Sequence, residues 1–590
     1  MTNSDNKMLS APVLYTFDFE RSVLFQLQNT PYGQNWPVVY ILSNGSEAYV
    51  GETSNASQRI INHLDNKKRK NLKRLDLLYS QSFNKSAILD LEASLILCMT
   101  SDQKFDLQNR NSGQSQAHDY YQRQEYQNLF PKIWNLLRKN HLADSSLDQI
   151  YNSDLFKFSP YKTLTVDQFE IAQSIICSLL ERIQDQADLN PDEQFAIQKD
   201  PIFVHGGAGT GKSVLGVYLA KTIADLKDGI IPDMEKLPDM APEIQVLKDS
   251  DFKIGLVVPV NAFKKTLSKV FKSLKIRNIQ VVSPVDAAKK KWDLLIVDES
   301  HRLKRRKNLT AYKSFDDTCR RLGLNHETAS QLDWILACSR FQVFLYDRHQ
   351  SVMPSDADYH QFKDWLDVST EQFSLESQMR CKGGADYVDY IQQLFSKDHP
   401  KEKEDFSKSY DFKLFSHLED MLEAIRDKEA CYGLCRVIAG YAWKWVTKEY
   451  TKLSDSHQQI VKEGKYDILA DGQRLIWNTT QDDWVGSPDA CNEVGCIHTI
   501  QGYDLNYAGV LVGPDIRYDP DRDCLTANLS EYFDVKGKNG MTNEEDTVEE
   551  NILRTYRILC TRGIRGTYIF AVDPKVRDYL KRYIQLEGQE

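Results

Sequence analysis

Short apolar runs that alternate with longer amphipathic segments make up most of the chain after residue 156. Each run has the length of a strand, and the segments between runs have the length of helices. This alternation is typical of βαβ units, whose parallel sheet is buried on both faces. We therefore predict an α/β fold with two parallel-sheet lobes. The runs are 201–206, 253–260, 293–300 and 341–347, and then 432–443, 509–514 and 566–573 after a charged stretch at 396–411.

The first part of the chain has a different pattern, in which short apolar runs lie closer together between polar helices. Two of them, 38–42 (VVYIL) and 48–52 (AYVGE), are spaced as the strands of a hairpin. A polar, glutamine-rich stretch then indicates the end of this domain. The predicted parts are a small mixed α/β domain at 33–125, a linker at 126–155, a first lobe at 156–372 and a second lobe at 373–590.

Composition is that of an ordinary globular protein and gives no overall sign of nucleic-acid binding. Of the 590 residues, 41% are hydrophobic and 27% are charged, and the net charge is −10. An acidic chain must bind nucleic acid through local basic patches. Two tracts offer such patches, 66–74 (NKKRKNLKR) and 301–308 (HRLKRRKN), and for both we favour phosphate contacts over a solvated face.

The termini and the cysteines predict a cytoplasmic protein. The N-terminal residues lack the pattern of a signal peptide, and no apolar run approaches the roughly 20 residues of a membrane span. Eleven scattered cysteines, mostly within apolar runs, indicate reduced thiols. A zinc site is disfavoured because the cysteines nearest to such a pattern are spaced too widely. They are Cys431, Cys435, Cys491 and Cys496.

The segment 206–213 (GGAGTGKS) fits the phosphate-binding pattern G-x-x-x-x-G-K-[ST] in full, between a predicted strand and a predicted helix. The backbone N–H groups of such a loop surround phosphates at a helix N-terminus. We expect Lys212 to reach the β- and γ-phosphates of ATP and Ser213 to bind Mg²⁺. The other expected loop contacts come from Gly206, Gly209, Thr210 and Gly211.

A second element of nucleotide chemistry is the strand 293–300 (DLLIVDES), which ends in adjacent carboxylates. Asp298 is expected to hold the Mg²⁺ ion, and Glu299 to position or deprotonate the attacking water. Together with the phosphate-binding loop, this pair predicts ATP hydrolysis.

These motifs, with six others in order, resemble those of superfamily 1 helicases, which implies two RecA-like lobes. LTVDQ (164–168) resembles the adenine-reading motif and points to Gln168, and 257–267 (VVPVNAFKKTL) resembles a motif that touches the nucleic-acid strand. FLYDRHQSV (344–352) resembles the motif that senses the γ-phosphate, with Asp347 and Gln350.

The second lobe carries the rest of the resemblance. LESQMRC (375–381) implies that Arg380 reaches the γ-phosphate, and YRILCTRG (556–563) implies an arginine finger at Arg562, with Arg565 as the weaker candidate. Residues 156–580 more narrowly resemble the helicase-like family related to the helicase domain of Schlafen group III proteins. A further motif, IHTIQGYD (497–504), supplies Thr499, Gln501, Gly502 and Asp504.

The N-terminal hairpin resembles the signature strands of a GIY-YIG nuclease domain, although Val38 replaces the first glycine of the signature. Tyr40 and Tyr49 match the signature tyrosines, and Gly51 allows the turn into the helix. Glu92 lies in an otherwise apolar helix, where a carboxylate is costly unless it is paired or binds a cation. The resemblance implies further site residues at Arg59, at His63 and at Asn109 or Asn111, with Asn109 preferred.

These residues suit single-metal phosphodiester hydrolysis. Mg²⁺ on Glu92 would polarise the scissile phosphate. The proton of the attacking water would pass to Tyr49, or to Tyr40 with His63. Arg59 would stabilise the charge of the transition state. The competing interpretation is that the tyrosines are cross-strand packing.

We therefore predict an ATP-dependent nuclease–helicase that acts on nucleic acid, with DNA favoured over RNA and ATP and Mg²⁺ as cofactors. One alternative is an ATP-gated sensor or clamp that licenses cleavage without processive unwinding. Another is an N-terminal domain that binds DNA without cleaving it. Resemblance to bacterial nuclease–helicase proteins suggests a role in defence against phage. Protein partners are not predicted.

Overall fold

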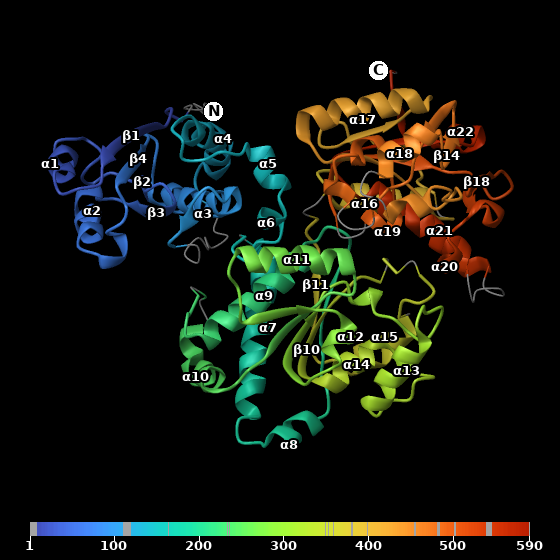
Figure 1. Cartoon of the computed structure of the whole chain (residues 1–590), viewed down its shortest axis with the longest axis horizontal. Helices are drawn as coiled ribbons and strands as arrows, with labels where there is room; N and C mark the ends of the chain where they lie inside the picture. The colour runs from blue at the N-terminus through green and yellow to red at the C-terminus, as the bar shows by residue number, and fades with distance from the viewer. Residues whose placement is uncertain are drawn as a thin grey trace, which may run out of the picture. The chain divides into compact units, whose positions relative to one another are not determined.

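The chain folds as two compact units, residues 1–169 and residues 170–590, in the computed structural model drawn in Figure 1. No helix of the described residues is long and apolar enough to cross a membrane. The described residues are 9–109, 120–162, 164–232, 234, 237–348, 350–351, 353–357, 359–378, 381–397, 399–452, 456–480, 484–500, 503–538 and 545–588.

The first unit is built around a five-stranded sheet with the strand order β1-β4-β2-β3-β5. The expected hairpin forms part of it, because β2 (Val38–Ser43) pairs antiparallel with β3 (Glu47–Thr53). The pairing of β3 with β5 is parallel, so the sheet is mixed. The other elements are β1 (Val13–Asp18), α1 (Val23–Gln28), α2 (Ala56–Leu64), η1 (Lys67–Arg69), β4 (Arg74–Tyr79), α3 (Lys85–Asp102) and β5 (Asp106–Leu107).

Helices occupy much of the region where the sequence predicts a linker. They are α4 (Arg123–Lys139), α5 (Leu147–Asn152) and α6 (Asp154–Lys157). In α4 the residues Tyr126, Phe130, Ile133 and Trp134 are buried in one cluster with apolar side chains of α3. Two glutamines from the end of the glutamine-rich stretch, Gln124 and Gln127, lie on the exposed face of this amphipathic helix.

The second unit contains both parallel-sheet lobes, which confirms the α/β fold class and the RecA-like architecture. The first sheet has the order β11-β6-β10-β9-β7-β8 and the second β16-β13-β17-β20-β12-β21. All the strand pairs of these two sheets are parallel. The strands are β6 (Ile202–Gly206), β7 (Ile254–Val257), β8 (Ile279–Val282), β9 (Trp292–Val297), β10 (Ser339–Tyr346) and β11 (Gln372–Leu375), then β12 (Asp411–Leu414), β13 (Cys435–Ala439), β16 (Val494–Cys496), β17 (Leu505–Val512), β20 (Gly563–Ala571) and β21 (Gln585–Leu586).

Helices and two short hairpins complete the second unit. The hairpins are β14 (Ile468–Ala470) with β15 (Gln473–Leu475), and β18 (Ile516–Asp519) with β19 (Cys524–Ala527). The helices are α7 (Val166–Asp185), which begins in the first unit, α8 (Pro191–Ala196), α9 (Lys212–Lys227), α10 (Ala241–Asp249), α11 (Asn261–Ser273), α12 (Pro284–Ala287), α13 (Tyr312–Arg321), α14 (Gln331–Cys338), α15 (Tyr359–Val368), α16 (Gly384–Leu394), α17 (Leu418–Tyr432), α18 (Ser456–Glu463), α19 (Ile497–Ile500), α20 (Val535–Lys538), α21 (Glu545–Cys560) and α22 (Pro574–Leu580).

Candidate functional sites

Three of the residues predicted for a nuclease site form one directed hydrogen-bond chain in the first unit. Arg59 on α2 donates from Nε to the hydroxyl oxygen of Tyr40 at 3.1 Å, and this oxygen lies 2.7 Å from Nε2 of His63. A guanidinium can only donate, so Tyr40 accepts from Arg59, and its own proton can be donated to His63 in the tautomer that leaves Nε2 unprotonated. The chain therefore runs from Arg59 through Tyr40 to His63.

The protonation states of this chain follow from burial. Tyr40 is fully buried, and burial raises its pKa above the ordinary value. Burial, together with the charges of Arg59 and Arg69, lowers the pKa of His63 to about 4. At neutral pH Tyr40 is therefore protonated and His63 is neutral, as the hydrogen bond between them requires.

Tyr49 is the signature tyrosine that is only half-buried. Its ring packs against His63 with centroids 4.9 Å apart, and Arg69 places Cζ 4.0 Å from the Tyr49 ring centroid. Arg69 also bonds to Gln108 through Nη1, whereas its buried Nε finds no partner among the described residues. The sequence analysis did not single out Arg69, and its only signal was membership of the basic tract 66–74.

Glu92 on α3 lies close to a second carboxylate that the sequence analysis missed, that of Glu52 at the end of β3. Burial and the Glu52 charge raise the pKa of Glu92 to about 7, while Lys85 and Arg59 oppose this rise. Glu52 forms an ion pair with Lys85 at 2.5 Å. Neighbouring carboxylates with a raised pKa are the kind of site that a divalent cation stabilises.

The described residues contain no group of three or more His, Cys, Asp or Glu side chains that could hold a metal ion. Any metal of the first unit would therefore rely on Glu92, with Glu52 beside it, rather than on a multidentate cage. Asn109 contacts β3 next to Tyr49: its side chain accepts from Val50 N at 3.3 Å and donates to Val50 O at 2.6 Å. Asn111 lies outside the described residues.

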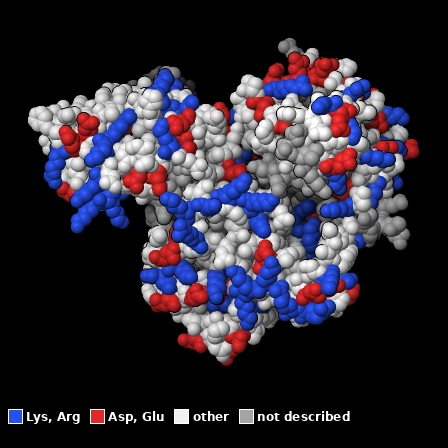
Figure 2. Space-filling view, in the orientation of Figure 1, with Lys and Arg blue, Asp and Glu red and all other residues white. Residues whose placement is uncertain are grey.

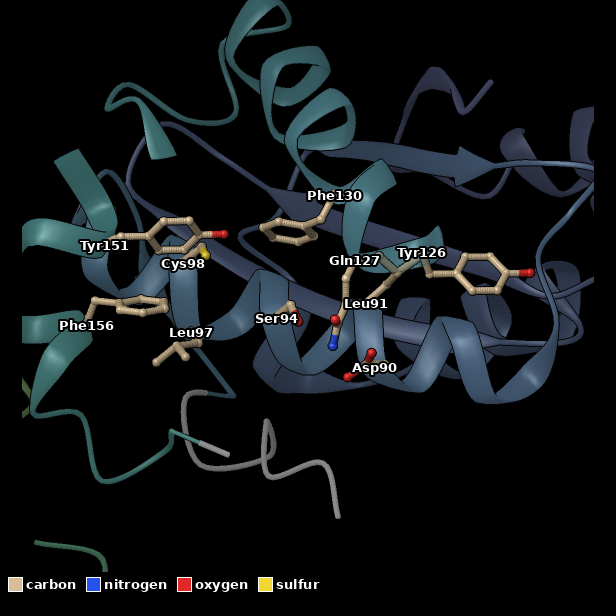
Figure 3. Close-up of a pocket in the computed structure, with 10 residues that line it drawn as sticks. All are labelled: Asp90, Leu91, Ser94, Leu97, Cys98, Tyr126, Gln127, Phe130, Tyr151 and Phe156. Carbon is tan, nitrogen blue, oxygen red and sulfur yellow. The ribbon is translucent and has the colours of Figure 1, made fainter. Parts of the chain in front are cut away.

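A cavity of about 270 Å³ in the first unit is separate from this cluster (Figure 3). Figure 3 shows Tyr151 and Phe156 side by side at one end and Asp90 near Gln127 toward the other. No predicted site residue lines it. It is lined by Asp90, Leu91, Ser94, Leu97 and Cys98 of α3, by Tyr126, Gln127 and Phe130 of α4, and by Tyr151 and Phe156.

The predicted phosphate-binding loop connects β6 to α9 in the second unit. Gly209 and Gly211 have φ of +85° and +83°, a left-handed conformation that favours glycine. The Lys212 ammonium donates to the carbonyl oxygens of Gly206 at 2.7 Å and Gly207 at 2.9 Å. The loop thus holds a buried cation at the N-terminus of α9, which suits phosphate binding.

The two carboxylates after β9 have different environments. Asp298 is buried, its Oδ1 accepts from Glu299 N at 3.0 Å, and its Oδ2 has no hydrogen-bond partner among the described residues. Burial and the Glu299 charge raise the pKa of Asp298. An orphaned buried carboxylate oxygen fits the expected role of Mg²⁺ ligand.

Glu299 is held in its ionised form. Its Oε2 lies 3.0 Å from Nε2 of His301, and it adopts a left-handed φ of +48°. Burial alone would raise the pKa of Glu299, but His301, Lys212 and Arg562 together hold it below its ordinary value. An ionised carboxylate can orient or deprotonate water. His301, which directly follows Ser300, was missed in the sequence.

A buried chain of polar contacts joins the phosphate-binding loop to the second lobe. Lys212 Nζ lies 3.5 Å from Oδ2 of Asp347, and Gln350 donates to the same oxygen at 2.5 Å. Arg562 Nη2 then donates to Gln350 Oε1 at 3.2 Å. Only 2% of the Arg562 surface is exposed, so the predicted finger is enclosed at this contact.

The other arginines of the second lobe have distinct positions. Arg565 lies away from this chain, with its Cζ 4.6 Å from the ring centroid of Tyr432. Arg554 on α21, which the sequence analysis did not select, donates from Nη1 to Ser351 O at 2.6 Å. The remaining second-lobe predictions, Arg380, Gln501 and Gly502, lie outside the described residues.

Two of the next three predicted residues form local hydrogen bonds. Gln168 is buried at the start of α7, where its Oε1 accepts from Thr165 N at 3.1 Å. Thr499 on α19 donates to Cys496 O at 2.9 Å. Asp504 is half-buried just before β17.

The two basic tracts differ in how their charges are compensated. In 66–74 the side chains of Lys67, Lys68, Lys70 and Lys73 are exposed, and Figure 2 shows Lys and Arg gathered beside α2 and over α11. In 301–308 most cations are paired with carboxylates. These pairs are Arg302–Asp356 (2.8 Å), Lys304–Asp356 (2.5 Å) and Arg306–Asp316 (2.7 Å).

Comparison with known proteins gives one family and several distant likenesses. Residues 199–573 match the family described as Schlafen group 3, DNA/RNA helicase domain. The uncharacterized protein YPL245W of Saccharomyces cerevisiae is 28% identical over 450 residues, which cover 71% of this chain and 91% of that protein.

Solved helicase structures are much less similar. The Arterivirus nonstructural protein 10 helicase is 13% identical with a TM-score of 0.27, covering 66% of this chain and 63% of its own. The Pif1 helicase from Candida albicans is 12% identical with a TM-score of 0.26, covering 71% of this chain and 99% of its own. The chain thus spans less than two thirds of the viral helicase that it matches.

Proposed function

Since the chain belongs to the Schlafen group 3 DNA/RNA helicase domain family, we propose that it is an ATP-hydrolysing motor on nucleic acid that carries a nuclease in its first unit. The motor part is proposed for residues 156–590 and the nuclease for residues 33–125. The observation that carries the motor proposal is the buried chain from Lys212 through Asp347 and Gln350 to Arg562.

This row of buried polar contacts supports a mechanism in which ATP hydrolysis depends on closure of the two lobes. Lys212 binds phosphate oxygens, Glu299 orients or deprotonates the attacking water, and Arg562 stabilises the charge that develops on the transferred phosphoryl group. Arg562 comes from the other lobe, so movement of the lobes changes its distance from the phosphate. Gln350 links the two events, because it contacts both Asp347 and Arg562.

In the first unit we propose Tyr49 as the general base, because it is the half-buried tyrosine. The ionised Tyr49 oxygen takes the proton from the attacking water and becomes a neutral phenol, and the Arg59 charge, which interacts with both tyrosines, favours the ionised form that accepts this proton. Tyr40 and His63 position Arg59. Mg²⁺, when bound by Glu92 in this unit or by Ser213 and Asp298 in the motor, would neutralise phosphate oxygens.

We favour DNA over RNA as the nucleic acid that this protein binds. A role in defence against phage and a cytoplasmic location stay predictions from the sequence. A clamp that hydrolyses ATP without separating strands would use the same lobe contacts. Strand separation measured beside ATP hydrolysis distinguishes the two: a motor shows both, and a clamp shows hydrolysis alone.

The test of the motor is nucleic-acid-stimulated ATP hydrolysis by wild type and Lys212→Ala. The variant loses the main cation at the phosphates, so we expect its rate to fall by about 100-fold or more. Thermal unfolding checks that the variant is folded. Unchanged ATP hydrolysis in the folded variant would show that the loop at 206–213 is not the nucleotide site.

A further inference from the structure

The loop that follows β13 in the second lobe is unusually aromatic for a surface loop. Its sequence, 440–447 (GYAWKWVT), alternates large rings with small or charged residues. Tyr441, Trp443 and Trp445 are all half-buried, and Lys444 between the two tryptophans is exposed. Each ring packs in part against the hydrophobic core of this lobe, and because all three are only half-buried, each also leaves part of its surface open to solvent.

The rings are held in place by a buried tryptophan and by pinned loop ends. Trp477, only 1% exposed, stacks on Tyr441 with centroids 5.7 Å apart, and Trp443 meets Trp477 edge-on at 6.2 Å. At the far end of the loop Thr447 bonds Asp467 through N at 2.8 Å and through its hydroxyl at 2.6 Å. Ring packing and the hydrogen bonds of Thr447 therefore hold the loop in one conformation.

The outer side of the loop is suited to a polyanion that carries flat rings. Lys444 and Lys448 are exposed, and neither forms an ion pair with an acidic side chain in the described part of the chain. The nearest acidic neighbour in sequence, Glu449, lies 3.9 Å from Lys465. The Trp445 indole N–H is buried without a hydrogen-bond partner among the described residues.

The loop also lies at the edge of the sheet where ligands of α/β folds bind. Strands β13 and β16 are parallel neighbours, so their carboxyl ends meet at one edge. Tyr441 contacts His498 there, with ring centroids 5.7 Å apart. His498 precedes Thr499 in the motif 497–504, which ties the aromatic loop to the helicase motifs.

We propose that the loop 440–447 is a stacking platform for single-stranded nucleic acid, with Trp443 and Trp445 packing against bases and Lys444 and Lys448 contacting phosphates. Base–aromatic stacking tolerates any sequence, and lysines that follow the backbone supply the electrostatic part of the affinity. This inference rests on the proposed motor function and names where the motor holds its strand.

The test is binding of labelled oligonucleotides of about 12 residues, within the range of single-strand site sizes. Oligo-dT and oligo-U are the DNA and RNA arms, and an abasic strand of equal length and charge is the third arm. We expect Trp443→Ala and Trp445→Ala to weaken binding of base-bearing strands by about 5- to 150-fold and to leave the abasic strand bound as before. Trp443→Phe should retain most of the affinity, because it keeps a ring.

The matched control is Val446→Ala in the same loop, since Val446 is 58% exposed and carries no ring. It should bind all three strands like wild type. If the alanine variants bind base-bearing strands as well as wild type does, or if wild type does not prefer them over the abasic strand, the platform is wrong. If wild type binds no strand at all, the proposed motor function fails instead. Should an alanine variant unfold, Lys444→Ala, which keeps every ring, still decides, because loss of a phosphate contact should weaken binding of all three strands and unchanged binding would contradict the platform.

Discussion

At the scale of single residues, the proposed nuclease cluster depends on the absence of a side chain at Gly51. Gly51 faces Tyr40 across the β2–β3 pair, and a Cβ atom on Gly51 would lie 2.3 Å from the Tyr40 hydroxyl oxygen. Tyr40 is fully buried, so it cannot swing away without disturbing Arg59 and His63. The glycine of the signature is thus a packing requirement at this position.

We predict that Gly51→Ala destabilises the first unit by about 1–3 kcal/mol through overpacking and displaces the Tyr40 hydroxyl. The matched control is Gly45→Ala at the hairpin turn, where an added Cβ would meet nothing within 4 Å. Chemical unfolding of both variants measures the difference. Equal stability of the two would mean that Tyr40 is not confined as the structure indicates.

A second residue-scale prediction concerns Asp515, which is buried after β17 and accepts from the Tyr556 hydroxyl at 2.5 Å. Burial raises its pKa from 3.8 to about 7 in the folded state. The folded state therefore binds the proton more tightly, and this contribution to stability is complete below about pH 4 and is lost as the pH rises through 7.

Asp515→Asn removes this dependence, and its amide oxygen can still accept from Tyr556. Relative to wild type, the variant should gain stability between pH 5 and pH 8, by an amount on the order of 3 kcal/mol. The measurement is the free energy of unfolding of both proteins across that range. Parallel pH profiles would show that Asp515 does not titrate as stated.

At the scale of elements, the sequence predicted the features that depend on a few consecutive residues. Apolar runs marked β6, β7, β9 and β10, and their periodicity predicted the parallel sheets that the structure confirms. The pattern G-x-x-x-x-G-K-[ST] predicted the phosphate-binding loop, and two adjacent acidic residues at the end of an apolar run predicted the carboxylates after β9. Contacts between segments that are distant in sequence could not be predicted. The proximity of Glu52 to Glu92 and the position of Arg69 over the Tyr49 ring depend on how β3, η1 and α3 pack.

The helices at 123–157 were not predicted from the sequence, for a related reason. Glutamine-rich composition suggested a linker, but the buried residues of α4 recur at helical spacing and pack against α3. The resemblance favoured Arg562 over Arg565 as the finger, but both lie in one short stretch, so the sequence did not show what either side chain contacts. Only the path of the chain from α21 into β20 places one at Gln350 and the other at Tyr432.

This difference gives an element-scale prediction with a built-in control. Arg562→Ala should lower kcat for ATP by about 10³- to 10⁵-fold while nucleotide affinity changes little, because a finger acts mainly in the transition state. Arg565→Ala should leave kcat within a few-fold of wild type. Steady-state hydrolysis and nucleotide binding are measured on both. A comparable loss of nucleotide affinity in Arg562→Ala would make it a ground-state ligand.

At the scale of the whole molecule, the two proposed reactions, ATP hydrolysis and phosphodiester cleavage, are assigned to two different folded units. The family match at 199–573 covers the motor and leaves the first unit outside it. The nuclease proposal therefore depends on Glu92, Tyr49 and Arg59 alone. Each unit has its own candidate metal ligands, so a change at one site should leave the other chemistry working.

The most direct test of this account is magnesium-dependent cleavage of labelled DNA and RNA by wild type and Glu92→Gln. Glutamine keeps the shape of the side chain but removes the charge on which the metal would rely. We predict that wild type cleaves and that the variant is slower by about 100-fold or more, with unchanged ATP hydrolysis by the same preparations and a thermal unfolding profile like that of wild type, which shows that the first unit is folded. Equal cleavage by both proteins, or no cleavage by wild type on any strand, would contradict the claim.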